Sequence, residues 1–231
     1  MMHSIFGQLP RFLSYYNLEF ILQAALTTLL LSISGCVFGF IFGFGIAVLR
    51  ETTGPLWLPL RAAAVLFVEI FRRIPFLVTL FLVFYACQAL NLDISVFAVA
   101  VASTCIIGAA FLSEVVRTGF DAIPSQEREA AAAMNFTLAQ TLFLIVIPQA
   151  WRVILPPTFA FFLSFIKDSA LASQLGVVEL TYSAKVMNNK GFSPVLGFGA
   201  ALILYFAISY PLARFGLYLE QRLGFSRYRK P

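Results

Sequence analysis

Residues 20–49 read FILQAALTTLLLSISGCVFGFIFGFGIAVL, a stretch without a single charged side chain. An α-helix needs roughly 20 apolar residues to cross a bilayer, so this stretch is long enough to span one with a tilt or an overhang. Its apolar residues are continuous, whereas the strands of outer-membrane barrels alternate apolar and polar positions over about ten residues. The stretch therefore predicts a transmembrane helix, and the remainder of the chain is expected to share its environment.

The composition of the whole chain agrees with a membrane environment. Of 231 residues, 60% are hydrophobic and only 12% are charged, whereas soluble domains carry roughly a quarter charged residues. Polar loops are too short for a separate soluble domain, so we expect one all-α transmembrane domain over 1–231, with its membrane core at about 20–219. The three cysteines lie inside apolar runs and are expected to pack as small apolar residues. Residues 1–19 lack the features of a signal peptide, so the first apolar run is expected to be retained.

Four further apolar segments complete the predicted map of crossings. The segment over 56–90 would be about 50 Å long as one helix, which is too long for a single unbroken span. Charged residues and a proline interrupt it at 72–75, and proline removes a backbone donor and kinks a helix. We therefore expect a lead-in helix over 56–72 and a crossing over 74–90. The other crossings are expected at 94–116, 150–171 and 195–219, which gives five in total.

Positive charge indicates which side of the membrane each loop faces. With five crossings, the loops and ends at 50–61, 117–152 and 214–231 share one side and carry ten lysine and arginine residues, against three on the other side. Lysine and arginine accumulate on the cytoplasmic side of membrane proteins. We therefore expect a periplasmic N-terminus, a cytoplasmic C-terminus and a cytoplasmic loop over 118–149.

This cytoplasmic loop contains its own helix signals. Residues 125–134, SQEREAAAAM, are strong helix formers, and Asn135 favours the left-handed conformation that ends a helix. Thr137 and Gln140 then fit a capping box at the start of a second helix, which is expected to end at Pro148. A solvated connector would have a similar composition, but an ordered helical hairpin on a membrane surface needs a partner to pack against.

The hairpin resembles the EAA loop of ABC importer permeases, whose pattern is Glu-Ala-Ala, three residues, Gly, nine residues, Ile, one residue, Leu, Pro. Asn135 stands at the position of the glycine and Ile147 at that of the leucine. Asparagine tolerates the left-handed conformation and isoleucine keeps the apolar volume, so both replacements are mild. The resemblance implies that ATPase subunits dock on the hairpin, where small alanine side chains allow close contact. The residues in register with the pattern are Glu129, Ala130, Ala131, Ile145 and Pro148.

Other stretches resemble the polar amino-acid branch of these permeases, the histidine/glutamine permease type. The resemblance extends over roughly residues 20–220, and the loop spacing together with Lys-Asp-Ser makes it specific. Arg73 replaces a usual glycine. The stretches are EIFRRIP at 69–75, EVVRTG at 114–119, IP at 123–124, LPP at 155–157 and KDSALAS at 167–173.

The resemblance implies a type I ABC importer fold in the bacterial inner membrane. Two permease subunits, identical or paralogous, would form the pathway, and two cytoplasmic ATPase subunits would bind ATP and Mg²⁺. A periplasmic binding protein would deliver a small polar amino acid, and the pathway would alternate between inward-open and outward-open states. Besides these proteins only membrane lipid is an expected partner, and nucleic acid is not.

The permease itself is expected to be non-catalytic. The sequence has one histidine, so no histidine-based metal site is expected. It has no glycine-rich loop ending in Gly-Lys-Ser or Gly-Lys-Thr, so we expect no catalytic or cofactor site in the chain.

Lys167, Asp168 and Ser169 are the candidate residues of the solute pathway. The two charges fall deep in the fourth crossing, where charged side chains are costly and usually face a cavity. Opposite charges would suit a solute with ammonium and carboxylate groups. A structural pair or a cap at the outer end of the helix is the alternative interpretation.

Two charged pairs are spaced three residues apart, which places each pair on one helix face. We expect an ion pair between Glu69 and Arg72 and another between Glu114 and Arg117, near the cytoplasmic mouth. A structural lock between segments is favoured over a gating network.

A face of small residues recurs every four positions in the first crossing, at Gly35, Gly39 and Gly43. Such a face lets another helix approach closely. The partner is expected to be a helix of the same subunit or of the second permease subunit.

Two other functions remain open from the residues alone, a stand-alone secondary transporter or channel and a non-transporting membrane scaffold. Secondary transporters commonly consist of two inverted repeats with matching helices, and an odd number of crossings such as five does not divide into two such repeats. Charges within the membrane and a capped cytoplasmic hairpin disfavour a scaffold. The identity of the amino acid and of the second permease subunit is not encoded in any of these features.

The predicted topology can be tested by labelling. Cysteines introduced at Ser4 and Ser125 are expected to react with a membrane-impermeant reagent from opposite sides, because an odd number of crossings separates the N-terminus from the hairpin. Labelling of both positions from the same side would contradict the five-crossing map.

Overall fold

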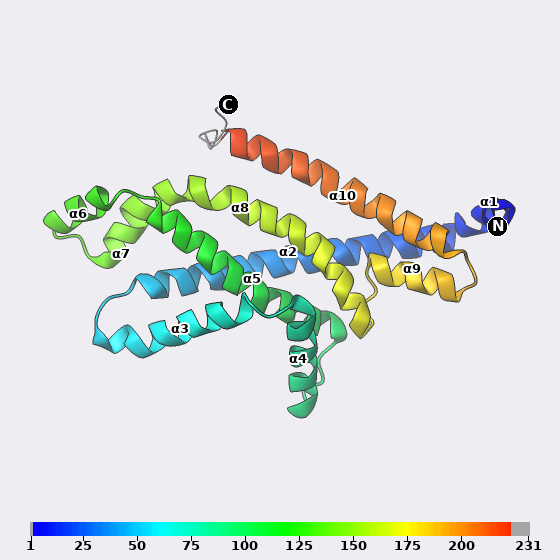
Figure 1. Ribbon diagram of the computed structural model, residues 1–231, viewed down its shortest axis with the longest axis horizontal. Coiled ribbons are helices and arrows are strands. Elements are labelled where there is room, and N and C mark those ends of the chain that lie inside the picture. The colour runs from blue at the N-terminus through cyan, green and yellow to red at the C-terminus, as the bar shows by residue number, and fades with distance from the viewer. Residues whose placement is uncertain (1, 223–231) are drawn as a thin grey trace. The chain divides into compact units, whose positions relative to one another are not determined.

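The computed structural model describes residues 2–222, with side chains from residue 7 onward, and its regular elements over this range are all helical. This confirms the all-α prediction. The four long helices in Figure 1 are α2 (Tyr15–Glu51), α5 (Val96–Asp121), α8 (Ile147–Asp168) and α10 (Pro194–Arg222). The shorter α-helices are α1 (Met2–Phe12), α3 (Leu58–Phe71), α4 (Phe76–Ala89), α6 (Ser125–Ala133), α7 (Leu138–Gln140) and α9 (Leu180–Asn189). Two 3-10 segments, η1 (Pro55–Trp57) and η3 (Ser169–Leu175), and one π-helical segment, η2 (Thr141–Val146), complete the fold.

Four helical runs are long and apolar enough to cross a membrane, namely α2, α5, the run from Leu138 to Leu175 and α10. They coincide with four of the five predicted crossings. The fifth, predicted over 74–90, is α4, an apolar helix of 14 residues. Such a helix is about 21 Å long, less than the roughly 30 Å of a hydrocarbon core. The sides on which the termini lie stay a prediction, and residues 223–231, which carry part of the charge behind it, lie outside the described residues.

The break predicted at 72–75 is confirmed. Helix α3 ends at Phe71 and α4 begins at Phe76, directly after Pro75. Proline restricts the residue before it and cannot donate a backbone hydrogen bond, so the long apolar segment divides into two helices at this point.

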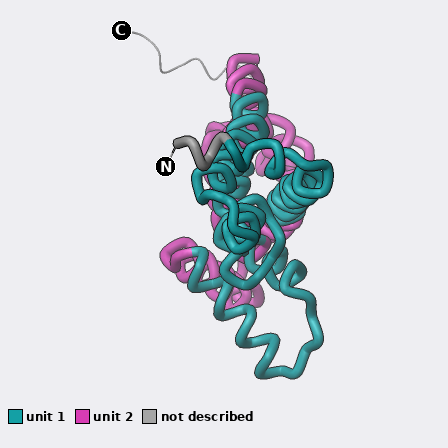
Figure 2. The backbone as a smooth tube through the Cα atoms, turned by 90° about the vertical axis from the view of Figure 1, so that its right-hand side faces the viewer, with its two compact units in different colours: residues 1–35, 76–104, 162–213 teal, residues 36–75, 105–161, 214–231 magenta. Residues whose placement is uncertain are grey.

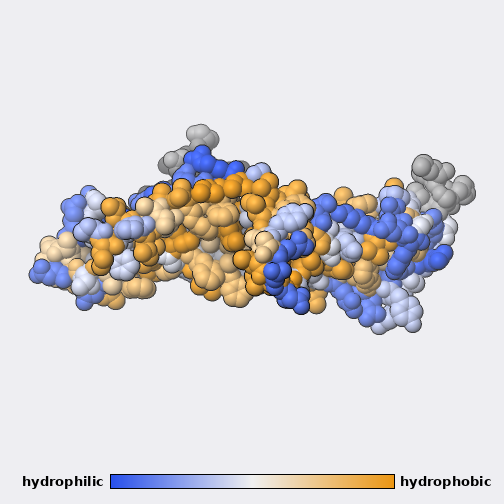
Figure 3. Space-filling model, turned by 90° about the horizontal axis from the view of Figure 1, so that it is seen from below, coloured by the Kyte–Doolittle hydropathy of each residue, from blue (hydrophilic) through white to orange (hydrophobic). Residues whose placement is uncertain are grey.

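Large apolar side chains are exposed along the helices. Leu22, Leu26 and Leu30 of α2 are 59%, 57% and 51% exposed. In the face drawn in Figure 3, apolar side chains cover much of the surface and hydrophilic side chains gather in separate patches. A surface of this kind is stable only against lipid tails or another apolar surface.

The chain groups into two compact units, coloured separately in Figure 2. The first unit comprises residues 1–35, 76–104 and 162–213, and the second comprises 36–75, 105–161 and 214–231. The bounds of the long helices show that each of them contributes residues to both units.

Each unit has buried apolar clusters of its own. In the first unit, Leu31, Leu80 and Ala100 belong to one cluster, and Leu180 and Met187 to another. In the second unit the buried side chains come from α2, α5, η2 and α8. They are Ala47, Val116, Phe120, Ile123, Leu142, Val146, Ala150 and Ile154.

The glycine face of α2 packs against α5 of the same chain. A Cβ atom on Gly39 would lie 2.9 Å from the Cα atom of Gly108, and one on Gly43 would lie 2.8 Å from the nitrogen of Ser113. Within the first unit, a Cβ atom on Gly35 would collide with the side chain of Thr104. The predicted packing role therefore holds, and the partner is a helix of the same subunit.

We expect Gly43→Ala to destabilise the protein, because the added methyl group meets the backbone of α5, which cannot move aside. Overpacking of this kind costs about 1–3 kcal/mol. Gly45→Ala is the matched control, since nothing lies within 4 Å of its added Cβ atom. Thermal unfolding of the purified protein in detergent measures both variants, and equal midpoints for the two would contradict the close approach.

Candidate functional site

The hairpin between α5 and α8 forms with the predicted stop and start signals. Helix α6 ends at Ala133, and Asn135 follows with φ of 59°, the left-handed conformation that asparagine tolerates. The capping box is present: the Thr137 nitrogen donates to Oε1 of Gln140 at 2.8 Å, and the Gln140 nitrogen donates to Oγ1 of Thr137 at 3.3 Å. The tight turn is thus fixed by local chemistry alone.

One face of the hairpin is exposed and the other is buried in its own chain. The side chains of Glu129 and Ala130 are exposed, and so are those of Ala132 and Ala133. Ala131 is only 2% exposed and faces inward. It is therefore not on the surface that an ATPase could contact, contrary to the expectation from the sequence. The reason is that α6 must bury one face, and four consecutive alanines do not reveal which face that is.

The second half of the hairpin adds an exposed apolar surface. Met134, Phe143 and Leu144 are 68%, 60% and 65% exposed, while Ile145 is half-buried and Pro148 is exposed. Exposed apolar side chains of this size on a polar hairpin favour a contact with another molecule.

The sequence predicted that the second helix of the hairpin ends at Pro148, and this prediction is wrong. The helix continues from α7 through η2 into α8, which ends at Asp168. Segment η2 is π-helical and ends at Val146, two residues before Pro148, whose missing N–H cannot complete an α-helical hydrogen bond. A wider turn accommodates this missing donor, so the helix continues where the proline was expected to end it.

Glu114 on α5 is the centre of a cluster of arginines in the second unit. It forms the predicted ion pair with Arg117 and a second one with Arg50 of α2, whose Nη1 atom lies 2.8 Å from Oε2 of Glu114. The Arg72 guanidinium is 3.9 Å from the same oxygen and 5.7 Å from the ring centre of Phe111. The cluster holds α2, the end of α3 and α5 together.

The predicted pair between Glu69 and Arg72 is wrong. Glu69 pairs instead with Arg73, one residue further on, at 2.6 Å. Arg72 is the C-terminal cap of α3 and extends toward Glu114, so it is not available to Glu69. The hydrogen bond from Arg73 holds the pKa of the Glu69 carboxyl below its ordinary value.

The three candidate pathway residues lie where α8 ends and η3 begins. Lys167 is exposed, Asp168 is half-buried, and the buried Ser169 donates its hydroxyl to the Ile166 carbonyl at 2.8 Å. The ion pairs between described side chains all lie in residues 50–128, and none of them includes Lys167 or Asp168.

Sequence analysis missed a buried carboxylate, Glu179, which is 0% exposed. It caps α9 by accepting from the nitrogens of Thr181 and Tyr182, and it accepts a 2.7 Å hydrogen bond from the Tyr205 hydroxyl. Burial raises the pKa of Glu179 above its ordinary value, and the hydrogen bonds oppose that shift. Glutamate is not among the preferred helix caps, so no local sequence pattern marked Glu179 as a cap.

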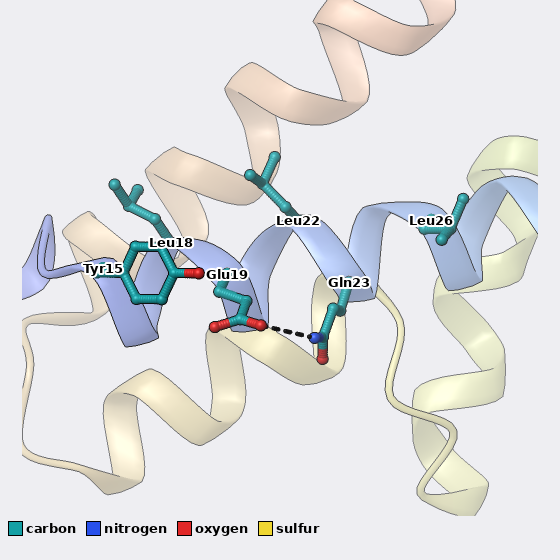
Figure 4. A pocket seen from close by; sticks show the side chains of 6 residues that line it. All are labelled: Tyr15, Leu18, Glu19, Leu22, Gln23 and Leu26. Atoms are coloured by element: carbon teal, nitrogen blue, oxygen red, sulfur yellow. Dashed lines mark hydrogen bonds between the residues drawn. The ribbon is translucent and has the colours of Figure 1, made fainter.

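A groove of about 510 Å³ lies along the first turns of α2. Figure 4 shows Glu19 and Gln23 on one side of it, joined by a 3.4 Å hydrogen bond, with Leu18 and Leu22 projecting the other way. All of the residues that line the groove come from the exposed side of α2, so no second element encloses it.

Comparison of the sequence with known proteins identifies the family of this chain. Residues 58–225 match the model of the binding-protein-dependent transport system inner membrane component. The chain is 32% identical to the probable glutamine ABC transporter permease protein GlnP of Bacillus subtilis (strain 168), over 90% of this chain and 96% of that protein. It is 32% identical to the L-cystine transport system permease protein TcyB of the same organism, over 85% of this chain and 83% of that protein. It is 28% identical to the arginine ABC transporter permease protein ArtQ of Haemophilus influenzae, over 92% and 96% of the two chains.

Solved structures share the fold. An amino acid ABC transporter crystallised with histidines superposes with a TM-score of 0.81 at 24% identity, over 88% of this chain and 94% of that one. The inward-facing MetNI methionine ABC transporter superposes with a TM-score of 0.77 at 19% identity, over 91% and 99%. The chain thus has the predicted type I importer fold. The family model covers most of the chain, so this multi-pass membrane protein belongs to the family of binding-protein-dependent transport system inner membrane components.

Proposed function

We propose that the chain is the permease subunit of an ATP-driven importer that carries a polar amino acid across the bacterial inner membrane. The observation that carries the proposal is the capped hairpin at 125–148, which presents exposed residues outward in a chain of this family. Relatives named for glutamine, cystine and arginine support a polar amino acid as the solute. Family membership argues against a stand-alone transporter or channel and against a scaffold.

In this proposal the ATPase subunits contact the exposed face of α6 and the apolar side chains of Met134, Phe143 and Leu144. The chain stays helical from Leu138 through η2 and α8 to Asp168, with Pro148, Pro156 and Pro157 as positions that donate no backbone hydrogen bond. A displacement of the hairpin would therefore reach the charged end of α8. ATP and Mg²⁺ stay with two ATPase subunits, and a binding protein and a second permease subunit, identical or paralogous, complete the importer.

At the end of α8, Lys167 and Asp168 carry opposite charges that suit the carboxylate and ammonium groups of an amino acid. Neighbouring residues on a helix point about 100° apart, so the two side chains can address two different groups of one solute. Partly desolvated charges interact with a charged ligand more strongly than charges in water do.

The proposed function is tested by uptake into proteoliposomes that contain the permease with its ATPase and binding-protein partners. We expect ATP-dependent uptake of a polar amino acid, and Asp168→Ala should lower uptake by about tenfold or more if it removes a charge from the solute contact. Glu19→Ala is the control, because Glu19 is an exposed acidic residue in the first turns of α2. The proposal fails if no amino acid supports uptake by the wild-type complex. The pathway role of Asp168 fails if its variant transports normally.

Docking of the ATPase is tested by a pair of tryptophan substitutions on α6. Ala133→Trp places bulk on the exposed face, and we expect the permease to insert normally while the ATPase dissociates or hydrolyses ATP without uptake. Ala131→Trp places the same bulk on the buried face, where overpacking should lower the stability of the permease itself by about 1–3 kcal/mol. Full ATPase retention with full uptake for Ala133→Trp would remove this face from the mechanism.

A further inference from the structure

Arg128 of α6 joins the hairpin to the ends of two long helices. Its Nη1 atom donates to Oε2 of Glu51, the last residue of α2, at 2.8 Å. Its Nη2 atom donates to the carbonyl oxygen of Phe120, in the last turn of α5, also at 2.8 Å. One side chain therefore bridges α2, α5 and α6 within the second unit.

The chemistry of the three groups fits a bridge of this kind. The last four carbonyl groups of an α-helix have no partner within the helix. The Phe120 carbonyl accepts from the Ile123 nitrogen at 3.2 Å, just beyond α5, and Arg128 is its second donor. The Glu51 side chain is only 15% exposed, so its ion pair with Arg128 is screened less than a surface pair is. The planar guanidinium offers several donors in fixed directions and reaches both acceptors at once, which a lysine ammonium at the same place does less well.

Neighbouring contacts make the bridge part of a larger junction. Arg50, beside Glu51, pairs with Glu114 of α5, so the end of α2 is held to α5 by one residue and to α6 by the next. Phe120 is fully buried in the apolar cluster that includes Leu142 and Val146 of η2. The hairpin is joined covalently to α5 through residues 122–124 and to α8 through η2, and Arg128 adds a polar connection to the end of α2.

We infer that Arg128 is a positioning residue that transmits movement of the hairpin to α2, in addition to the covalent routes through α5 and α8. The inference rests on the proposed function. When the hairpin moves with an ATPase, the bridge carries the end of α2 along with it. Without the bridge, the hairpin and the attached end of α5 can move while the end of α2 follows less closely, and ATP hydrolysis proceeds with less transport.

The test compares Arg128→Ala with wild type in reconstituted complexes, measuring ATPase binding, ATP hydrolysis and amino acid uptake separately. We expect the ATPase to be retained and to hydrolyse ATP, with uptake per ATP reduced roughly fivefold or more, the range of a typical coupling between two sites. Arg128→Lys keeps the charge and should give an intermediate ratio. Glu51→Ala should resemble Arg128→Ala, and the double variant should be no worse than the more severe single one, because both remove the same contact.

Arg61→Ala is the matched control. Its guanidinium also donates to a carbonyl beyond the end of α2, that of Thr52 at 2.7 Å, but this bond stays within the connection from α2 to α3. Uptake per ATP for Arg128→Ala equal to that of wild type or of Arg61→Ala would overturn the inference. If Arg128→Ala does not assemble, Arg128→Gln and Arg128→Lys provide the same comparison with side chains of similar length.

A second measurement does not depend on transport. Spin labels at Thr53 and Ala132, in a variant without its three native cysteines, report the distance between the end of α2 and α6 by pulsed electron resonance. We expect one narrow distance distribution with Arg128 and a broad one with Arg128→Ala. A narrow distribution in both proteins would contradict the bridge even if the complex proved to transport no amino acid at all.

Discussion

The close approach of α2 to α5 is the constraint on which the second unit depends. Lipid tails are as apolar as the helix surfaces, so two membrane helices gain little from hydrophobic burial and must gain from close packing instead. Gly39 and Gly43 bring the two backbones into contact, and the ends of the helices then lie near enough for Arg50 to reach Glu114. The arginine cluster is therefore a consequence of the packing between backbones.

The hairpin depends on a different kind of contact, made by polar groups at helix ends. Asn135 and the capping box around Thr137 fix its turn, and Arg128 supplies a donor to the carbonyl end of α5. Each of these contacts satisfies backbone groups that a helix terminus leaves free. The hairpin is thus a rigid element that belongs to the permease, with its exposed residues directed away from the buried cluster.

Local features of the fold followed from the sequence, and long-range ones did not. Long apolar runs predicted four of the crossings, a proline predicted the break at 72–75, and Asn135 and Thr137 predicted the turn, because each signal acts within a short stretch of sequence. The inward orientation of Ala131 depends on what packs against α6, which four alanines in a row cannot reveal. Glu69 pairs with Arg73 and not with Arg72, because Arg72 extends from the end of α3 toward Glu114, which is distant in the sequence. Glu179 was missed because its partners include Tyr205, which is far away in the sequence.

Segment η2 has a consequence for the helix that leaves the hairpin. A π turn holds one more residue than an α turn, and at 3.6 residues per turn each residue rotates the helix by about 100°. If the turn at 141–146 tightened into α-helix, one residue would be released, and α8 would rotate by that step relative to α6. The π-helical turn therefore sets the direction in which the side chains of α8 point as the helix leaves the hairpin.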